Sequence, residues 1–434
     1  MAKKVLIVTY YWPPAGGGGV QRWVKFVKYL RDYGWEPIVF TADGADYPVL
    51  DLSLASEIPP SAEVIKHMII EPYTLYKLIS GKKSKEKIDP NFLSQGKQLN
   101  WKDKLAVWVR GNLFIPDARF LWIRPAAKAI DKYLVSHDID AIISTGPPHS
   151  CHLIAKQVAK KHHLPWIVDF RDPWTGIDYF DDLRLSSFAL SRHKKLEKSV
   201  LDHASCVITV GKTMAADLAK ITDSRIEVIT NGFDESDRPQ QHAITHDGFE
   251  ISYIGTMNDA RNPLGFWQAI ANIKQSQPSV YNNIRINLVG APELIVIQSI
   301  EKFSISECIN YVGYVTHKEA LQYLDKAAVL LLIINNTSNN KSILTGKIFE
   351  YLMVKKPILC IGPQDGDAAD IIYRAQAGVV LDYKAVDSIS DFIMQQYQMF
   401  VNGSDVRMRG DIEQYSRTSL TQKLATVLNE ITHK

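Results

Sequence analysis

The sequence has little cysteine, no long apolar run and almost no excess of charge, and each shortage excludes a class of protein. Its 434 residues include four cysteines, widely spaced and without a Cys-x-x-Cys pair, so neither a disulfide framework nor a zinc site is supported. No apolar stretch approaches the ~20 residues that a membrane-spanning helix needs. Fifty basic against 47 acidic residues give a net charge of +3, too small to indicate a nucleic-acid partner. The expected location is a reducing cytoplasm.

Short β-branched apolar runs alternate with amphipathic stretches along most of the chain, which is typical of parallel sheets wrapped by helices. The helix after the first run, for example, has its apolar residues at 20, 23, 24, 27 and 30, on one face. We predict strands at residues 5–9, 37–41, 64–70, 141–145, 166–170, 206–210, 226–230, 249–254, 286–289, 309–312, 328–333, 357–361 and 378–381. The first run, at residues 5–9, is too short for a signal peptide.

The predicted fold is α/β, with two doubly wound, Rossmann-like domains that face each other across a crevice. A polar stretch rich in Asp, Gln, His and Gly interrupts the pattern and predicts a linker at residues 236–248. The domains are then residues 1–235 and 249–405. A helical segment at residues 406–434 follows, with the option of packing back on the N-terminal domain.

One segment, from Lys77 to Lys104, departs from the alternation. It has eight lysines against three acidic residues and little apolar periodicity. A solvated insertion is the simpler interpretation. The alternative is a basic surface that contacts anionic lipid or a lipid-linked pyrophosphate, as a peripheral contact at the cytoplasmic face of the inner membrane.

A run of four glycines follows the first predicted strand and precedes a helix. Without side chains, Gly17, Gly18 and Gly19 let backbone N–H groups approach a ligand at the positive end of the helix. The spacing is not Gly-x-Gly-x-x-Gly, which disfavours a dinucleotide site. A flexible hinge loop is the alternative interpretation.

Two further motifs of the first half follow predicted strands. His149, as a neutral imidazole, can hydrogen-bond a sugar hydroxyl, although a structural histidine is equally compatible. Arg171 can bind an acceptor hydroxyl or phosphate, or form a structural ion pair with a neighbour such as Asp172. Trp174 offers a flat face against which a sugar can pack.

The second half opens in the same way, with a glycine and a cation after its first strand. Gly255 permits close approach of a ligand, and Arg261 carries a forked cation.

A second candidate in this half is the start of a helix near residue 346. Gly346 and Lys347 place bare amides and a cation at its positive end, and Thr345 can cap it. This arrangement suits a diphosphate. Glu350, one turn later, can accept both hydroxyls of a ribose. The alternative is a surface pair of Lys347 with Glu350.

Six motifs in this order resemble the GT4 family of retaining glycosyltransferases, which has the GT-B fold. The likeness covers nearly the whole chain, at residues 16–22, 144–150, 169–174, 230–234, 255–263 and 346–352. The resemblance implies that the N-terminal domain binds the acceptor and the C-terminal domain binds a nucleotide-sugar donor.

The resemblance also implies roles for single positions. The glycine loop matches the loop that closes over the donor phosphate and touches the acceptor. His149 matches the histidine that contacts the donor sugar, Arg261 a residue that neutralises the diphosphate, and Glu350 the ribose ligand. The residues expected at the acceptor are Arg22, Arg171, Asp172 and Trp174.

Two positions depart from the family pattern. Thr256 stands where the first arginine of the diphosphate clamp is usual, and Lys347 can replace its charge. Ser342, eight residues before Glu350, stands where a glutamate usually contacts the sugar. The identity of the donor sugar therefore does not follow from the resemblance to the family.

The predicted reaction moves a sugar from a UDP-sugar or GDP-sugar to a polysaccharide or lipid-linked acceptor, with retention of configuration. Arg261, Lys347 and the loop amides would stabilise the leaving diphosphate. Neither a cofactor nor a metal is expected, since no Asp-x-Asp follows a predicted strand. The alternatives are a nucleotide-sugar epimerase and a catalytically silent sugar-nucleotide-binding partner of a polysaccharide assembly complex.

Overall fold

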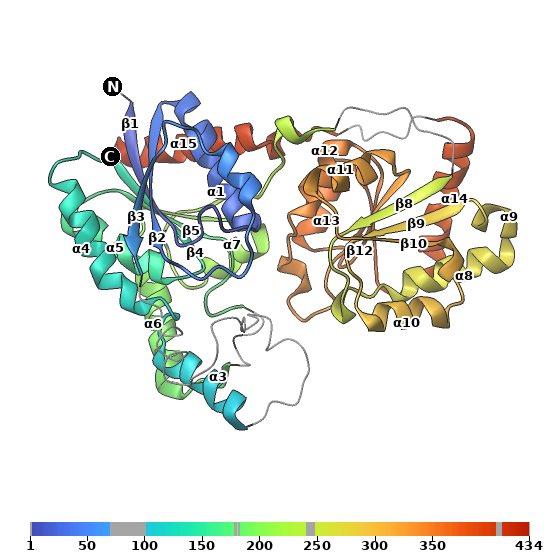
Figure 1. Ribbon diagram of the computed structural model, residues 1–434, viewed down its shortest axis with the longest axis horizontal. Coiled ribbons are helices and arrows are strands. Elements are labelled where there is room, and N and C mark those ends of the chain that lie inside the picture. Colours follow the sequence, from blue (N-terminus) through green and yellow to red (C-terminus); the bar gives the residue numbers. More distant parts are fainter. Residues whose placement is uncertain are drawn as a thin grey trace. The chain divides into compact units, whose positions relative to one another are not determined.

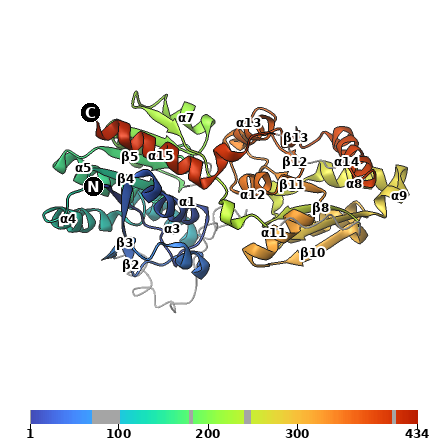
Figure 2. The same cartoon turned by 90° about the horizontal axis from the view of Figure 1, so that it is seen from above.

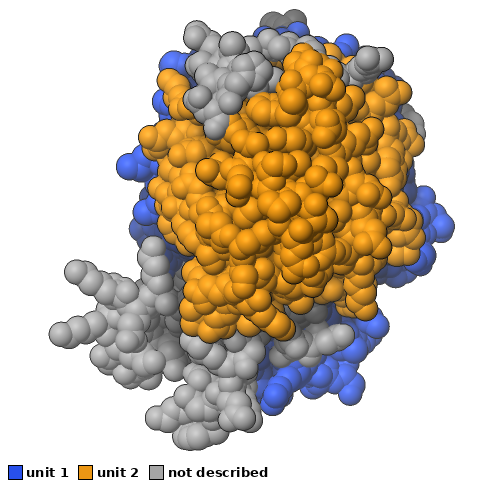
Figure 3. Space-filling view, turned by 90° about the vertical axis from the view of Figure 1, so that its right-hand side faces the viewer, with its two compact units in different colours: residues 1–230, 417–434 blue, residues 231–416 orange. Residues whose placement is uncertain are grey.

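The chain divides into two compact units, which are described separately. The computed structural model describes residues 2–69, 101–177, 180, 183–239, 248–404 and 410–433, with only the backbone at 101–106. Unit 1 comprises Met1–Thr230 and Arg417–Lys434, and unit 2 comprises Asn231–Ser416 (Figure 3). The basic segment predicted from Lys77 lies outside the described residues up to residue 100.

Unit 1 contains a parallel sheet with the strand order β3-β2-β1-β4-β5-β6-β7 (Figure 1). Alternate residues of β1 enter different cores, Leu6 on one face and Ile7 on the other, because successive strand side chains point in opposite directions. The strands are β1 Lys3–Val8, β2 Trp35–Asp43, β3 Glu63–Met68, β4 Ala141–Gly146, β5 Trp166–Phe170, β6 Cys206–Thr209 and β7 Ile226–Val228.

Helices cover both faces of this sheet (Figures 1 and 2). On one face lies the first helix, whose residues 20, 23, 24, 27 and 30 are buried as predicted, with α15 beside it. The other face carries α4 and α5. The helices of unit 1 are α1 Gly18–Tyr29, α3 Trp101–Leu113, α4 Ile123–Leu134, α5 Ser150–His162, α6 Ser187–Leu201, α7 Lys212–Leu218 and α15 Arg417–Thr432.

Unit 2 repeats this plan with a parallel sheet of order β10-β9-β8-β11-β12-β13. The strands are β8 Phe249–Ile254, β9 Ile284–Val289, β10 Ile309–Gly313, β11 Val329–Ile333, β12 Ile358–Ile361 and β13 Gly378–Leu381. The helices are α8 Leu264–Ser276, α9 Pro278–Tyr281, α10 Leu294–Lys302, α11 His317–Lys326, α12 Lys347–Val354, α13 Asp367–Arg374 and α14 Val386–Val401.

Each predicted strand is present to within a few residues, and the predicted α/β fold of two doubly wound sheets is confirmed. The division of the chain differs from the prediction in detail. Phe233 donates its backbone N–H to the carbonyl of Tyr415 at 3.1 Å and is buried in the core of unit 2. Unit 2 therefore begins at Asn231 and ends at Ser416, rather than spanning 249–405.

The C-terminal helix α15 belongs to unit 1, where Leu424 and Leu428 are fully buried. No helix in the described part of the chain is both long and apolar enough to cross a membrane. The four cysteines are all buried and free.

Candidate functional site

In unit 2 the residues of interest gather where β8 and β11 lie side by side. The connections from these two strands lead to opposite edges of the sheet, which makes this point a topological switch, the usual place for a ligand in such folds. Gly255 follows β8 with φ +111°, a value that side chains rarely adopt. A Cβ at this glycine would also overlap the Lys347 ammonium, so the backbone is bare where the lysine crosses it.

The structure brings Lys347 and Arg261 together around Tyr253. Lys347 Nζ donates to Tyr253 Oη at 3.3 Å and lies 4.6 Å from the centre of its ring. Arg261 is held by Asn335, whose Oδ1 accepts from Nε at 2.5 Å, and by the carbonyl of Thr256, 3.4 Å from Nη1. The two cations therefore occupy the same end of the sheet.

Burial, reinforced by repulsion from Arg261, lowers the pKa of Lys347 to about 8, and Glu350 offsets part of this shift. Within the described residues, neither Lys347 nor Arg261 forms an ion pair with a carboxylate. Two close cations that form no ion pair with a carboxylate of the described residues favour an anionic ligand.

The start of α12 lies in the same region. Its N-cap is Gly346, without a side-chain cap, and not Thr345 as the sequence suggested. Thr345 Oγ1 accepts from the backbone N–H of Lys347 only at 3.5 Å, a weak bond. The amides of Ile348 and Phe349 donate to the carbonyls of Thr345 and Gly346 at 3.3 and 3.2 Å, so the N–H groups open to a ligand at this helix end are those of Gly346 and the weakly bonded Lys347.

The side chains of Glu350 and Ser342 have different partners. The Glu350 carboxylate lies 3.1 Å from His317 Nε2 and is 28% exposed, one turn beyond Lys347. Ser342 donates its hydroxyl to the carbonyl of Asn339 at 2.9 Å, so it closes its own turn.

In unit 1 the glycine loop forms the start of α1. Gly17 is the N-cap with φ +106° and has no side-chain cap, and the positions of Cβ atoms at Gly17 and Gly18 are open space. At Gly19 a Cβ would collide with the Arg171 guanidinium, which lies against this glycine. Arg171 Nη2 also donates to the carbonyl of Pro147 at 2.5 Å. Arg171 therefore places a cation beside the backbone amides at the start of α1. Asp172, the next residue along the chain, is exposed.

Two residues predicted at the acceptor are buried inside unit 1. Arg22 is 0% exposed and forms an ion pair with Asp169 at 3.1 Å, while its Nη1 donates to the carbonyl of Thr230 at 2.7 Å. Trp174 is 2% exposed and donates its indole N–H to His193 at 3.1 Å. Neither side chain is available to an acceptor, because its polar and apolar surfaces are already used by the fold.

His149 stacks on Trp174, with ring centres 4.4 Å apart and planes within 2°. Burial, with repulsion from His193 and Arg171, lowers the pKa of His149 to about 3, so the imidazole is neutral. It is 9% exposed, and its Nδ1 has no hydrogen-bond partner in the described residues. The neutral ring is therefore largely covered by unit 1, and its unpartnered Nδ1 lies below the surface.

Sequence reasoning missed Tyr253 and Asn335. Tyr253 lies inside a predicted strand, where an aromatic residue is ordinary, so it gave no signal. Asn335 follows β11 directly at the switch point, and a polar residue in that place was a usable signal.

Residues 95–237 match the model of Glycosyltransferase Family 4. The resemblance to this family that the motifs predicted is confirmed over these residues, which contain the motifs at 144–150, 169–174 and 230–234. No curated protein matches the sequence. The match supports a glycosyltransferase of the GT4 type, although it spans less than half of the chain.

Solved structures extend the likeness in fold to the whole chain. Sucrose-phosphate synthase from Thermosynechococcus elongatus is 13% identical, with 99% of this chain and 96% of that chain covered and a TM-score of 0.57. WaaG, a glycosyltransferase involved in lipopolysaccharide biosynthesis, is 12% identical, with 98% and 99% covered and a TM-score of 0.51. A mutant of S. aureus TarM in complex with Fondaparinux, alpha-GlcNAc-glycerol and UDP is 14% identical, with 99% and 100% covered and a TM-score of 0.56. The fold is that of the GT-B glycosyltransferases.

Proposed function

We propose that the protein is a retaining glycosyltransferase that uses a nucleoside diphosphate sugar, with UDP or GDP as the leaving group, and a glycan or lipid-linked acceptor. The observation that carries the proposal is the pair of cations Lys347 and Arg261 at the bare backbone of Gly255. A nucleoside diphosphate supplies the negative charge that this pair lacks. The TarM structure, which holds UDP and alpha-GlcNAc-glycerol, supports this donor and acceptor chemistry.

The chemistry of the chain is electrostatic in this proposal. Cleavage of the sugar–phosphate bond leaves two negative charges on the nucleotide, which Lys347, Arg261 and the backbone amides of residues 346 and 347 stabilise. Glu350 accepts hydrogen bonds from the ribose. The neutral His149 and the cationic Arg171 of unit 1 are proposed to bind hydroxyl or phosphate groups of the substrates.

Metal independence is part of the proposal. In the described portion of the chain, no group of three or more His, Cys, Asp or Glu side chains is arranged to hold a metal ion. The diphosphate charge would instead be met by the two cations. Release of nucleotide that is unchanged by EDTA is the expected result, and loss of activity that Mg²⁺ restores would contradict it.

The deciding experiment incubates the protein with UDP-, GDP- and ADP-sugars, chosen by thermal shift because a bound ligand raises the melting temperature. Slow release of UDP or GDP supports the transferase, and the anomeric configuration of a transferred sugar tests retention. An isomerised donor would support the epimerase instead. Tight binding without any turnover would support a silent binding partner.

Co-sedimentation with anionic vesicles tests the predicted membrane contact of residues 77–104.

A further inference from the structure

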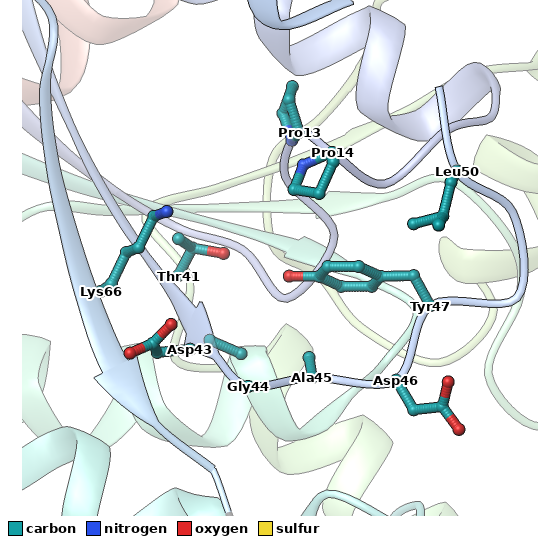
Figure 4. Close-up of a pocket in the computed structure, with 11 residues that line it drawn as sticks. Pro13, Pro14, Thr41, Asp43, Gly44, Ala45, Asp46, Tyr47, Leu50 and Lys66 are labelled. Atoms are coloured by element: carbon teal, nitrogen blue, oxygen red, sulfur yellow. The ribbon is translucent and has the colours of Figure 1, made fainter. Parts of the chain in front are cut away.

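A cavity of about 360 Å³ lies in unit 1 at the carboxyl ends of β1, β2 and β3, and the proposed function has not used it (Figure 4). Its volume is at the lower end of the ~300–1,000 Å³ typical of small-molecule sites. It therefore has room for one small ring rather than for a nucleotide.

One side of the cavity is polar. Thr41 is paired with Lys66 across β2 and β3, and Asp43 follows two residues later, so these three side chains share a face of the sheet. Figure 4 shows them together, with the hydroxyl of Tyr47 directed toward them. In the described part of the chain, neither the Asp43 carboxylate nor the Lys66 ammonium has a hydrogen-bond or ion-pair partner. Both side chains are exposed, so a charged acceptor and a charged donor are accessible to a ligand at this side of the cavity.

The opposite side is apolar. The ring of Tyr47 spans the cavity and is itself supported by Tyr10, with ring centres 5.8 Å apart, while Pro13, Pro14 and Leu50 complete the wall (Figure 4). A pyranose ring matches both sides, because its C–H face packs on an aromatic ring and its hydroxyls bond to carboxylates and ammonium groups.

The charge of the lining selects among sugars. The cavity is lined by two carboxylates, Asp43 and Asp46, and by one ammonium, Lys66. Because Asp46 interacts with another group of the chain, a phosphate or a carboxylated sugar would meet one carboxylate, Asp43, and one ammonium, Lys66, and therefore no excess of positive charge. An uncharged ring is therefore favoured over an anionic one.

The cavity is connected to the glycine loop by backbone hydrogen bonds. Gly16 donates its N–H to the carbonyl of Val49 at 2.9 Å, and Asp51 donates its N–H to the carbonyl of Pro14 at 2.9 Å. The loop that walls the cavity and the loop that starts α1 are thus paired. The cavity therefore lies next to the glycine loop within unit 1.

We propose that this cavity is a subsite for one uncharged sugar ring of the acceptor, with Asp43, Lys66 and Tyr47 as its specificity-determining residues. The proposal rests on the proposed function, which supplies the reason for a glycan to bind in unit 1. It narrows the acceptor to a glycan with a neutral sugar at this position.

The test is saturation-transfer NMR on the full chain with the methyl α-glycosides of glucose, galactose and mannose, and with glucose 6-phosphate as the charged comparison. At least one methyl glycoside is expected to bind saturably. Asp43→Asn and Lys66→Met should each weaken its Kd by about tenfold, the effect of losing a hydrogen bond to a charged group. The matched variants Asp138→Asn and Lys132→Met, at exposed positions of unit 1, should leave the Kd unchanged.

Three results would overturn the subsite. They are no saturable binding of any glycoside, equal weakening by the matched variants, and tighter binding of glucose 6-phosphate that depends on Lys66. UDP and GDP binding, measured in parallel, separates the two proposals. Glycoside binding without nucleotide binding would refute the proposed function and leave the subsite, and the reverse would refute the subsite alone.

Discussion

At the scale of single residues, Lys347 shows that the site is built at the expense of stability. Burial and Arg261 lower its pKa to about 8, while the unfolded chain keeps the ordinary value of 10.5. The folded state therefore carries the full electrostatic penalty below pH 8, and the penalty disappears as the pH rises toward 10.5. An anionic ligand would remove the same penalty at neutral pH.

Lys347→Met should raise the free energy of unfolding and abolish binding of the nucleotide-sugar donor. The gain at neutral pH is up to about 3 kcal/mol, the free energy that corresponds to the lowered pKa. It is measured by thermal unfolding, with UDP and GDP affinity from calorimetry. In the unmodified protein the affinity should fall as the pH rises through about 8, and in the variant this pH dependence should vanish. Lys318→Met, at an exposed lysine, is the control, and an unstable variant with normal affinity would contradict the role.

Arg261→Ala should reduce kcat by about 100- to 1,000-fold, as the loss of one preorganised charge donor does in other enzymes. The fold should persist, because the guanidinium is only partly buried and its hydrogen bonds are with Asn335, Thr256 and Tyr253 at the end of the sheet. Steady-state kinetics with circular dichroism measures both effects. The control Arg285→Ala, at an exposed arginine of the same unit, should leave kcat unchanged. Equal kcat values for the two variants would remove Arg261 from the site.

Glu350→Gln should weaken nucleotide binding by about tenfold, since a hydrogen bond from a ribose hydroxyl to a charged group would be lost. The sharper measurement compares UDP with 2′-deoxy-UDP by calorimetry. The unmodified protein should discriminate between them, and the variant should not. His317→Ala leaves the Glu350 carboxylate in place and should keep the discrimination. Discrimination that survives Glu350→Gln would exclude the ribose role.

At the scale of elements, Asp169 joins three parts of unit 1. It lies on β5 and accepts from Arg22 at 3.1 Å, from Trp23 of α1 at 2.8 Å and from Thr145 of β4 at 2.9 Å. Burial is the main effect on Arg22 and lowers its pKa, and Asp169 opposes this shift. The motif that resembles an acceptor contact in sequence therefore holds the helix of the glycine loop against the sheet.

Asp169→Asn should destabilise unit 1 by about 3–5 kcal/mol, because it leaves the Arg22 charge buried without its counter-charge. Denaturant unfolding measures the loss. Asp217→Asn removes an exposed pair with Lys220 and should cost less than about 1 kcal/mol. A loss at Asp169 no larger than this control would show that the buried pair is not a structural connection.

At the scale of the whole molecule, the chain passes from unit 1 to unit 2 and returns. The two crossings are paired, since Phe233 bonds to the backbone next to Ser416. The last helix, α15, then completes a core of unit 1 that residues near the N-terminus began. The core of unit 1 is therefore incomplete until α15 has been made.

Leu428→Ala in α15 should destabilise unit 1 by about 2–5 kcal/mol, as a buried cavity does. Tryptophan fluorescence can follow this unit, because eight of the nine tryptophans lie in unit 1 and only Trp267 lies in unit 2. Leu294→Ala, at a leucine 68% exposed in unit 2, is the control. A transition that stays at the same denaturant concentration would show that α15 is dispensable.

The local pattern of the chain was sufficient to predict the strands, the doubly wound class and the glycine-bearing loops at strand ends. Strand alternation and helical periodicity are properties of a few neighbouring residues. The conformational freedom of a glycine such as Gly255 likewise follows from its residue type alone. Arg261 and Lys347 were predicted as a pair because both follow parallel strands of one sheet, whose carboxyl ends meet at one edge.

Burial and partner choice were decided only by the tertiary structure. Arg22 and Trp174 have the composition of surface recognition residues, yet Asp169 lies 147 positions from Arg22 and neutralises it inside the fold. The same holds for Lys66 and Asp43, which a strand pairing leaves without a partner beside a cavity. Free energies of burial and pairing depend on which distant segments come together, and no window of neighbouring residues contains that information.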